Sequence, residues 1–177
     1  PRINLTTGKL SGFVYSANCG WVNLGSNGTH FVQSNTIEPG PDSDSDTISD
    51  AWELEQAAAA GLSPVLTHIA KATDADGDGQ TDLEEYLADS NPFDANDFFR
   101  VLNFQVTKLP ADNVTIQWTS SPRRLYTIGS NNNLGPFTVN QNDLAPESGA
   151  STSRTFTDLL QPPKKFWRVG AKLPLSP

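Results

Sequence analysis

The chain of 177 residues has one cysteine and no methionine. It also has no apolar run that approaches the roughly 20 residues of a membrane-spanning helix. The lone Cys19 cannot form an internal disulfide, and we expect it to be a small buried hydrophobic residue and not a reactive thiol. A chain that starts at Pro1 without methionine predicts a processed or truncated precursor, whose signal peptide would lie outside this sequence. These absences favour a secreted protein without a membrane span.

Motifs of the common enzyme classes are missing as well. No phosphate-binding loop, dinucleotide fingerprint or thiolate zinc cluster is present. His30 and His68 are the only histidines, and neither adjoins a known nucleophile motif. The carboxylates suggest glycoside hydrolysis, but their regular spacing is better explained by metal ligation. We therefore expect no enzyme, and the net charge of −8 argues against a nucleic acid partner.

Negative charge is concentrated in the middle of the chain. Residues 38–97 hold sixteen of the twenty carboxylates and a single base, Lys71, which gives this segment a formal charge of −15. Residues 1–37 carry +2 and residues 98–177 carry +5. A compact segment of such charge repels itself unless cations neutralise it. We therefore expect the middle segment to be loose without bound cations.

Residues 74–85 have the spacing of a twelve-residue calcium-binding loop. Gly79 stands at position 6, where such a loop bends sharply. The alternating Asp carboxylates point into one small volume, position 7 offers its backbone carbonyl, position 9 reaches the ion through a water, and position 12 can bind through both oxygens. Together they supply the roughly six to eight oxygen ligands that calcium prefers. The predicted ligands at positions 1, 3, 5, 7, 9 and 12 are Asp74, Asp76, Asp78, Gln80, Asp82 and Glu85.

Residues 42–53 repeat this spacing 32 residues earlier, which indicates one unit used twice. Position 6 is Thr47 and not glycine, which makes the bend costlier if it needs a positive φ. The six ligand positions of this loop predict a second calcium site. They are Asp42, Asp44, Asp46, Ile48 (through its carbonyl), Asp50 and Glu53.

At these residues the chain resembles the thrombospondin type 3-like calcium repeats of bacterial extracellular proteins, an EF-hand-type arrangement of Asp-rich loops and short helices. The resemblance covers roughly residues 38–97, and the run 82–92 is similar to the common exit of such a repeat. It implies calcium-dependent structure and a secreted or cell-surface setting, and it implies no reaction. Dockerin modules also pair two such loops, but they usually carry Asp or Asn at position 12, where this chain has Glu53 and Glu85.

Short helices are predicted around the two loops. Good helix formers run from Ile48 to Ala60, and Ser63-Pro64 predicts the start of a second helix through Ala70. An exit helix that holds Leu83, Tyr86 and Leu87 is predicted next, and it stops at Asn91-Pro92. Three further carboxylates surround that stop, and we leave open whether they complete a third calcium site: Asp89, Asp94 and Asp97.

The segments on either side are predicted to be β. Residues 1–37 read as a meander with strands at 12–17, 21–24 and 29–32 and a turn at Asn27-Gly28. Residues 98–177 alternate in hydrophobicity as in a sandwich of about seven strands, and they loosely resemble the fibronectin-like modules of secreted bacterial proteins. We expect Trp118 and Trp167 in the core, and Arg123-Arg124 in a solvated turn or, alternatively, on an acidic partner. The expected strands are 98–106, 113–119, 124–128, 137–139, 152–157 and 166–171.

The combined prediction is a mainly β chain with a small helical calcium-loop segment: a meander at 1–37, the calcium unit at 38–97 and a β-sandwich at 98–177. A meander of this size buries too little to stand alone, and open strand edges can pair with another copy. We therefore expect a secreted, calcium-stabilised structural or adhesive protein that forms a homo-oligomer or filament, such as a surface layer, through β-strand edges. The alternative is a carbohydrate-binding accessory module of an extracellular enzyme.

Overall fold

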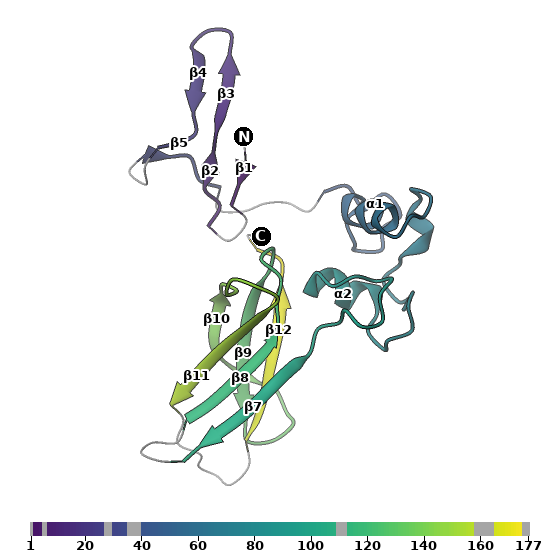
Figure 1. Cartoon of the computed structure of the whole chain (residues 1–177), viewed down its shortest axis with the longest axis vertical. Helices are drawn as coiled ribbons and strands as arrows, with labels where there is room; N and C mark the ends of the chain where they lie inside the picture. Colours follow the sequence, from purple (N-terminus) through teal and green to yellow (C-terminus); the bar gives the residue numbers. More distant parts are fainter. Residues whose placement is uncertain are drawn as a thin grey trace. The chain divides into compact units, whose positions relative to one another are not determined.

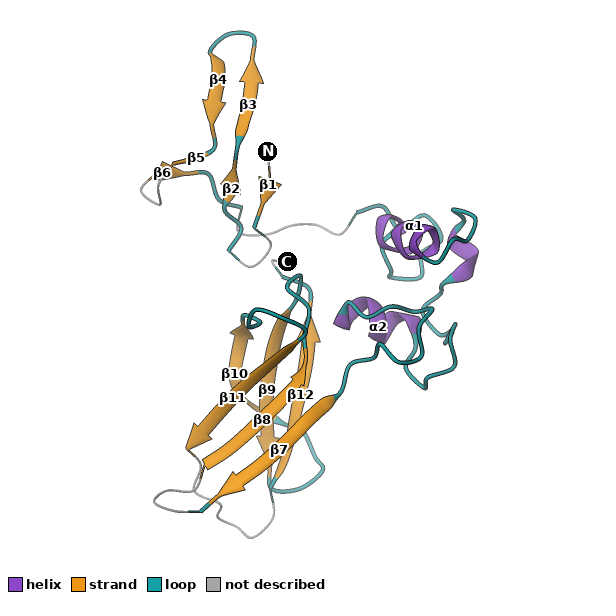
Figure 2. Ribbon diagram, in the orientation of Figure 1, coloured by secondary structure: helices purple, strands orange, loops and turns teal. Residues whose placement is uncertain are grey.

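The computed structural model describes residues 2–4, 7–26, 30–34, 40–108, 113–157 and 165–174. In this part of the chain the protein is mainly β, as predicted, with two short α-helices (Figures 1 and 2). The chain divides into two compact units, residues 1–39 with 173–177 and residues 40–172. No helix among the described residues has the length and apolar character needed to cross a membrane.

The first unit contains three short antiparallel strand pairs. β1 (Arg2–Ile3) pairs with β2 (Leu10–Ser11), β3 (Phe13–Ser16) with β4 (Gly20–Asn23), and β5 (Gly25–Ser26) with β6 (His30–Phe31). The predicted strands at 12–17 and 21–24 form the β3–β4 hairpin, whereas the predicted turn at Asn27-Gly28 lies outside the described residues.

Cys19 lies in the turn between β3 and β4 and is exposed. The prediction that it is buried is therefore wrong. A turn at the end of a two-stranded hairpin is not covered by a second layer of structure, so a small apolar side chain there stays in solvent.

Helix α1 (Asp50–Ala59) lies within the predicted helical range and ends before Gly61, which has a φ of +73°. The second predicted helix is wrong, because only the 3-10 turn η1 (Leu66–His68) forms there. Its flanking residues Val65 and Ile69 are extended, with φ of −130° and −127°. Ile69 is 1% exposed in that conformation, so tertiary burial of a β-branched side chain overrides the local start signal.

Helix α2 (Asp82–Ala88) begins inside the second acidic loop. The Thr81 hydroxyl accepts a hydrogen bond from the backbone N–H of Glu84, and the Glu84 carboxylate accepts one from the N–H of Thr81. This capping box fixes the point at which the loop becomes helix. The helix ends at Asp89, which is left-handed with a φ of +65°.

Six seven-residue strands follow, and they form two antiparallel sheets of three strands each. The sheet orders are β11-β8-β7 and β10-β9-β12. The prediction of about seven strands is one too many for the described part of residues 98–172. The strands are β7 (Val101–Thr107), β8 (Asn113–Thr119), β9 (Leu125–Asn131), β10 (Thr138–Leu144), β11 (Ser151–Thr157) and β12 (Phe166–Lys172).

The hydrophobic core of these strands comes from the two central strands. Alternate residues of β8 point inward, and Trp118 is fully buried with its ring centroid 5.7 Å from that of Tyr126 on β9. The expected core position of Trp118 is thus confirmed, and Trp167 packs against the same core. Truncation of a buried aromatic residue of this kind costs about 3–5 kcal/mol. The buried cluster is Val114, Ile116, Trp118, Tyr126 and Ile128.

The predicted solvated turn is wrong for Arg124 and holds in part for Arg123, which lies in a turn with a half-exposed side chain. Arg124 is 5% exposed, and its guanidinium donates to the carbonyls of Tyr86 and Leu87 at the end of α2. Both arginines form ion pairs with the buried carboxylate of Asp89. The acidic partner is therefore in the same chain, and these contacts hold the end of α2 against the start of β9.

Candidate metal centre

Loop two, residues 74–85, brings three carboxylates together. Oxygens of Asp74, Asp76 and Asp78 all lie within 4.8 Å of one another. Two oxygens on the same calcium ion are separated by at most about 5 Å, because each Ca–O bond is about 2.4 Å long. The group is therefore compact enough to hold one metal ion.

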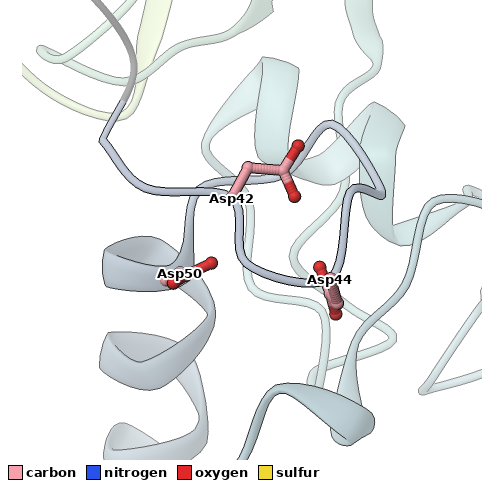
Figure 3. A group of neighbouring side chains, drawn as sticks. All are labelled: Asp42, Asp44 and Asp50. Carbon is pink, nitrogen blue, oxygen red and sulfur yellow. The ribbon is translucent and has the colours of Figure 1, made fainter.

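Loop one, residues 42–53, contains two overlapping groups with the same property. The first joins Asp42 and Asp44 of the loop to Asp50 at the first turn of α1 (Figure 3). The second joins Asp44 and Asp46 to Glu53. Asp44 belongs to both groups, so the loop gathers its acidic side chains around one region.

The first aspartate of each loop bonds to the loop's own backbone. Asp74 Oδ2 accepts from the N–H of Gly79 at 3.0 Å, and Asp42 Oδ2 accepts from the N–H of Thr47, also at 3.0 Å. In both cases position 1 is joined to position 6. This bond draws the chain back over the first carboxylate.

The aspartates at position 5 also make equivalent hydrogen bonds in the two loops. Asp78 Oδ1 accepts from the N–H of Gln80 at 2.7 Å, and Asp46 Oδ1 accepts from the N–H of Ile48 at 2.8 Å. The side chains at position 7 themselves differ, because Ile48 is fully buried whereas the Gln80 amide bonds to the backbone of Phe99. Only the position 7 backbone is thus shared by the two loops, which agrees with a role for its carbonyl.

The ninth position closes each loop. Asp82 Oδ1 accepts from the N–H of Ala75 at 3.0 Å, and Asp50 Oδ1 accepts from the N–H of Ser43 at 2.8 Å. Asp82 Oδ2 also accepts from the Ala70 N–H and the Thr73 hydroxyl. The position 9 carboxylates therefore hold the two ends of each loop together, and contact with an ion would be additional to that role.

The loops also share their left-handed residues. Gly77 and Gly79 have φ of +79° and +98°, and the equivalent Ser45 and Thr47 have φ of +63° and +78°. The concern that position 6 needs a positive φ is thereby confirmed. A residue with a side chain is strained in this region, and a β-branched residue such as Thr47 especially so.

The glutamates at position 12 are the most unusual groups of the site. Glu53 is 1% exposed and Glu85 is fully buried. Neither oxygen of Glu53 has a hydrogen-bond partner, and Oε2 of Glu85 has none. Burial of a carboxylate without a partner is costly unless a positive charge compensates it.

The pKa of Glu53 is raised from 4.5 to about 7, first by burial and next by the neighbouring carboxylates of Asp44 and Asp46. Burial likewise raises the pKa of Glu85 to about 8, with Asp76 and Asp78 as the next causes. Each position 12 group thus faces the acidic cluster of its own loop. A cation between the glutamate and the aspartates would offset both the burial of the carboxylate and the repulsion from its acidic neighbours.

The buried oxygens that lack partners test whether a metal fits. Besides those of Glu53 and Glu85, they include Oδ2 of Asp76 and Oδ2 of Asp78. These five oxygens belong to predicted ligand positions, and they are hard carboxylate oxygens, which suit calcium or magnesium. The one other such oxygen among the described residues, Asp89 Oδ1, is ion-paired with Arg124. The residues therefore fit a divalent cation in each loop.

The structure gives no support to a third site. Asp89 is ion-paired with two arginines, Asp97 accepts from the N–H of Asn91, and Asp94 accepts from the N–H of Asn96. The three do not come together in the described part of the chain.

The two loops are joined by a backbone contact that sequence reasoning missed. Asp46 Oδ2 of loop one accepts from the N–H of Lys71 at 2.9 Å, one residue after Ala70, whose N–H is bound by Asp82 of loop two. The rings of Trp52 on α1 and Tyr86 on α2 also meet edge to face, with centroids 5.2 Å apart. Loop one is therefore held to loop two by a polar and an aromatic contact.

No family model, curated protein or solved structure matches this chain. The resemblance to thrombospondin type 3-like repeats therefore stays a prediction, and the site is interpreted from its own residues.

Proposed function

We propose that each acidic loop binds one calcium ion and that the two ions stabilise residues 40–97. The observation that carries this proposal is the pair of buried position 12 glutamates, Glu53 and Glu85, with oxygens that lack partners beside a group of aspartates. In loop one the ligand groups are Asp42, Asp44, Asp46, the Ile48 carbonyl and Glu53. In loop two they are Asp74, Asp76, Asp78, the Gln80 carbonyl and Glu85.

Charge neutralisation is the physical effect of such binding. Two calcium ions bring +4 to a segment that carries −15, at the places where carboxylates lie closest. An ion that binds only the folded protein stabilises it by about 2.7 kcal/mol per site when free calcium is about 100-fold above the dissociation constant. The proposed role of calcium is thus structural, and no opening of a helix pair is required of it.

We further propose that the protein is a secreted, calcium-stabilised structural or adhesive protein without enzymatic activity, and that it self-associates through β-strand edges. Support comes from the rigid attachment of the acidic segment to the strands that follow it. Gln80 makes two hydrogen bonds to the backbone of Phe99, and Arg124 holds the end of α2. Two three-stranded sheets over one core also suit the predicted fibronectin-like sandwich.

A carbohydrate-binding accessory module has less support. Such a module presents exposed aromatic rings on one face of a sheet. In the described part of residues 98–172, the exposed rings Phe104 and Phe166 belong to different sheets, and Trp118 and Tyr126 are buried.

Isothermal titration with calcium tests the proposal. We expect two ions per wild-type chain and one ion per chain in each of Glu53→Gln and Glu85→Gln. Glu55→Gln is the matched control, because it makes the same change of charge on α1 at an exposed side chain, and it should still bind two. Absence of uptake by the wild type, or uptake by the Glu53 and Glu85 variants equal to that of the control, would refute the calcium assignment.

A further inference from the structure

The strand β7 is an unpaired edge with unusual composition. It lies at one end of the sheet order β11-β8-β7, so among the described strands only one side of its backbone is hydrogen-bonded to a neighbour. All seven of its residues are exposed, and none is charged. A long, uncharged edge strand is a template for pairing with another chain.

The hydrophobic core is also open along this strand. Phe104 and Val106 lie opposite Ile116 and Val114 of β8, so their side chains point to the core side of the sheet. The two β8 residues are at most 1% exposed, whereas Phe104 and Val106 are 48% and 42% exposed. One further strand beside β7 would pack its own same-face side chains against the exposed flank of Phe104 and Val106.

The other edge strands of these two sheets carry features that oppose pairing. β11 and β12 carry charged residues, Arg154 on β11 and Arg168 and Lys172 on β12. β10 has two register irregularities and a left-handed Asp143. Charges and bulges of this kind are the usual protection of strand edges. β7 has one register irregularity of its own, between Val101 and Asn103, but among these four edges it is the one that lacks a charge.

Charge argues against symmetric pairing of β7 with the same strand of a second copy. The antiparallel register that pairs all seven residues places Phe104 opposite itself. Arg100 then lies opposite Lys108 of the other copy, at both ends of the strand. Like charges directly opposite each other destabilise a strand pair.

Within the described part of the chain, one other exposed β element suits the open edge. The β3–β4 hairpin, residues 12–24, has no charged residue. Phe13, Tyr15 and Trp21 share one of its faces, because Tyr15 pairs with Trp21 and Phe13 is two residues from Tyr15. These rings are 56%, 67% and 72% exposed, and both outer edges of the hairpin are unpaired in the described residues.

We propose that the outer edge of β7 accepts the β3–β4 hairpin of a second copy of this chain. The hairpin adds hydrogen-bonded strands beside β7 and places its aromatic face next to Phe104 and Val106 on the core side of the sheet. Because donor and acceptor are different surfaces, the contact is heterologous and can continue from copy to copy. This inference rests on the proposed structural role, but it does not depend on calcium binding.

The area that the hairpin and β7 can bury together limits the expected affinity of the contact. Fully buried aromatic side chains cover about 150–250 Å² each, and those of this contact are already partly covered. The total stays near or below the roughly 1,200 Å² at the lower end of specific interfaces. We therefore expect dissociation constants between about 1 μM and 1 mM, and a concentration-dependent assembly.

Sedimentation of the full chain in saturating calcium, from about 10 μM to about 1 mM, tests the proposal. The wild type should associate as its concentration rises. Phe104→Lys, which blocks the acceptor, and Trp21→Lys, which blocks the donor, should each stay monomeric alone. Mixed together they should form one-to-one dimers and no longer chains, because one variant keeps a working donor and the other a working acceptor. Val139→Lys, at an exposed apolar position of β10, is the matched control and should associate like the wild type.

Several results would overturn the inference. They are a monomeric wild type at all concentrations, association of either blocked variant alone, absence of dimers in the mixture, and loss of association in the Val139 control. Hydrogen exchange adds a readout that does not depend on the variants, since amides of residues 101–107 should gain protection as wild-type concentration rises. Calcium uptake measured on the same samples separates the two proposals, because normal uptake with no assembly would refute this contact alone.

Discussion

The two acidic loops share their hydrogen bonds but differ in the residues that make the bends. Loop two uses Gly77 and Gly79 where φ is positive, and loop one uses Ser45 and Thr47. Left-handed backbone costs a residue with a side chain about 1–2 kcal/mol. Equal ligand spacing therefore does not mean equal affinity, and we expect loop one to bind calcium more weakly than loop two.

The loops also differ in how they are anchored. Loop two is tied directly to the β sheets, through the hydrogen bonds of Gln80 to Phe99 and through Arg124 at the end of α2. Loop one and α1 reach the rest of the unit through the segments that flank loop two, by way of Asp46 and the contact of Trp52 with Tyr86. An exposed ion pair of Glu55 with Arg123 is a further contact of α1 with the segment before β9. Damage to loop two should therefore loosen loop one, whereas damage to loop one should leave loop two intact.

Removal of calcium should have the largest effect. Two occupied sites contribute about 5 kcal/mol at a free concentration about 100-fold above the dissociation constants. For a chain of this length that corresponds to a fall of roughly 10–20 °C in melting temperature. Differential scanning calorimetry with calcium and with chelator measures it, and an unchanged midpoint would contradict a structural role for the ion. Because the loops differ in affinity, titration of calcium into the chelated protein should restore stability in two steps.

Replacement of Arg124 by Met should cost about 3–5 kcal/mol, because it leaves the buried carboxylate of Asp89 without its buried partner. The matched control is Arg123→Met, which removes a half-exposed guanidinium from the same carboxylate and should cost clearly less. Urea unfolding measures both. Calcium affinity should fall at loop two in the Arg124 variant, and equal losses in the two variants would show that burial of this ion pair does not matter.

The pH dependence without metal should run opposite to that with metal. The pKa of Glu53 is raised from 4.5 to about 7 and that of Glu85 to about 8, mainly by burial. Each folded carboxyl therefore holds its proton to higher pH than the unfolded chain does. This contribution to stability is complete below about pH 4.5 and is lost as pH rises through about 7 for loop one and about 8 for loop two.

Melting temperatures in metal-free buffer between about pH 5 and pH 9 measure the direction of this pH dependence. They should fall as pH rises, and Glu53→Gln should remove the lower part of the decline. In excess calcium, protons compete with the ion, so stability should fall as pH is lowered. A metal-free midpoint that increases steadily with pH would contradict the unpartnered burial of these glutamates.

The acidic loops could be located from sequence because their geometry is local. Each ligand lies within twelve residues of the others, and period-two alternation similarly marked the strands β8 and β12. The capping box of Thr81 and Glu84 is likewise local, since the two residues are three positions apart.

The features that were missed depend on contacts between distant residues. Arg124 meets the end of α2 at a separation of 37 to 38 residues, and nothing near Arg124 in the sequence distinguishes a buried arginine from a solvated one. Ile69 is extended because it is buried against other segments, which a start signal at Ser63-Pro64 does not reveal. The open core along β7 likewise becomes visible only once the two sheets are assembled.

The difference between glycine and threonine at position 6 of the two loops can be tested by exchanging these residues. We expect this exchange to have the smallest effect on stability and calcium affinity. Thr47→Gly should stabilise loop one by about 1 kcal/mol and tighten its calcium binding, because glycine adopts a φ of +78° without strain. Gly79→Thr should weaken loop two by a similar amount, and through strain alone, since a Cβ at Gly79 would meet no atom within 4 Å.

Thr47→Ala is the control that separates backbone strain from loss of the side chain. Alanine keeps the Cβ and with it the cost of the left-handed turn, so this variant should not gain what the glycine variant gains. Calcium titration of the three variants gives the affinities of both loops. If alanine improves loop one as much as glycine does, the threonine side chain and not the left-handed backbone is what makes loop one the weaker site.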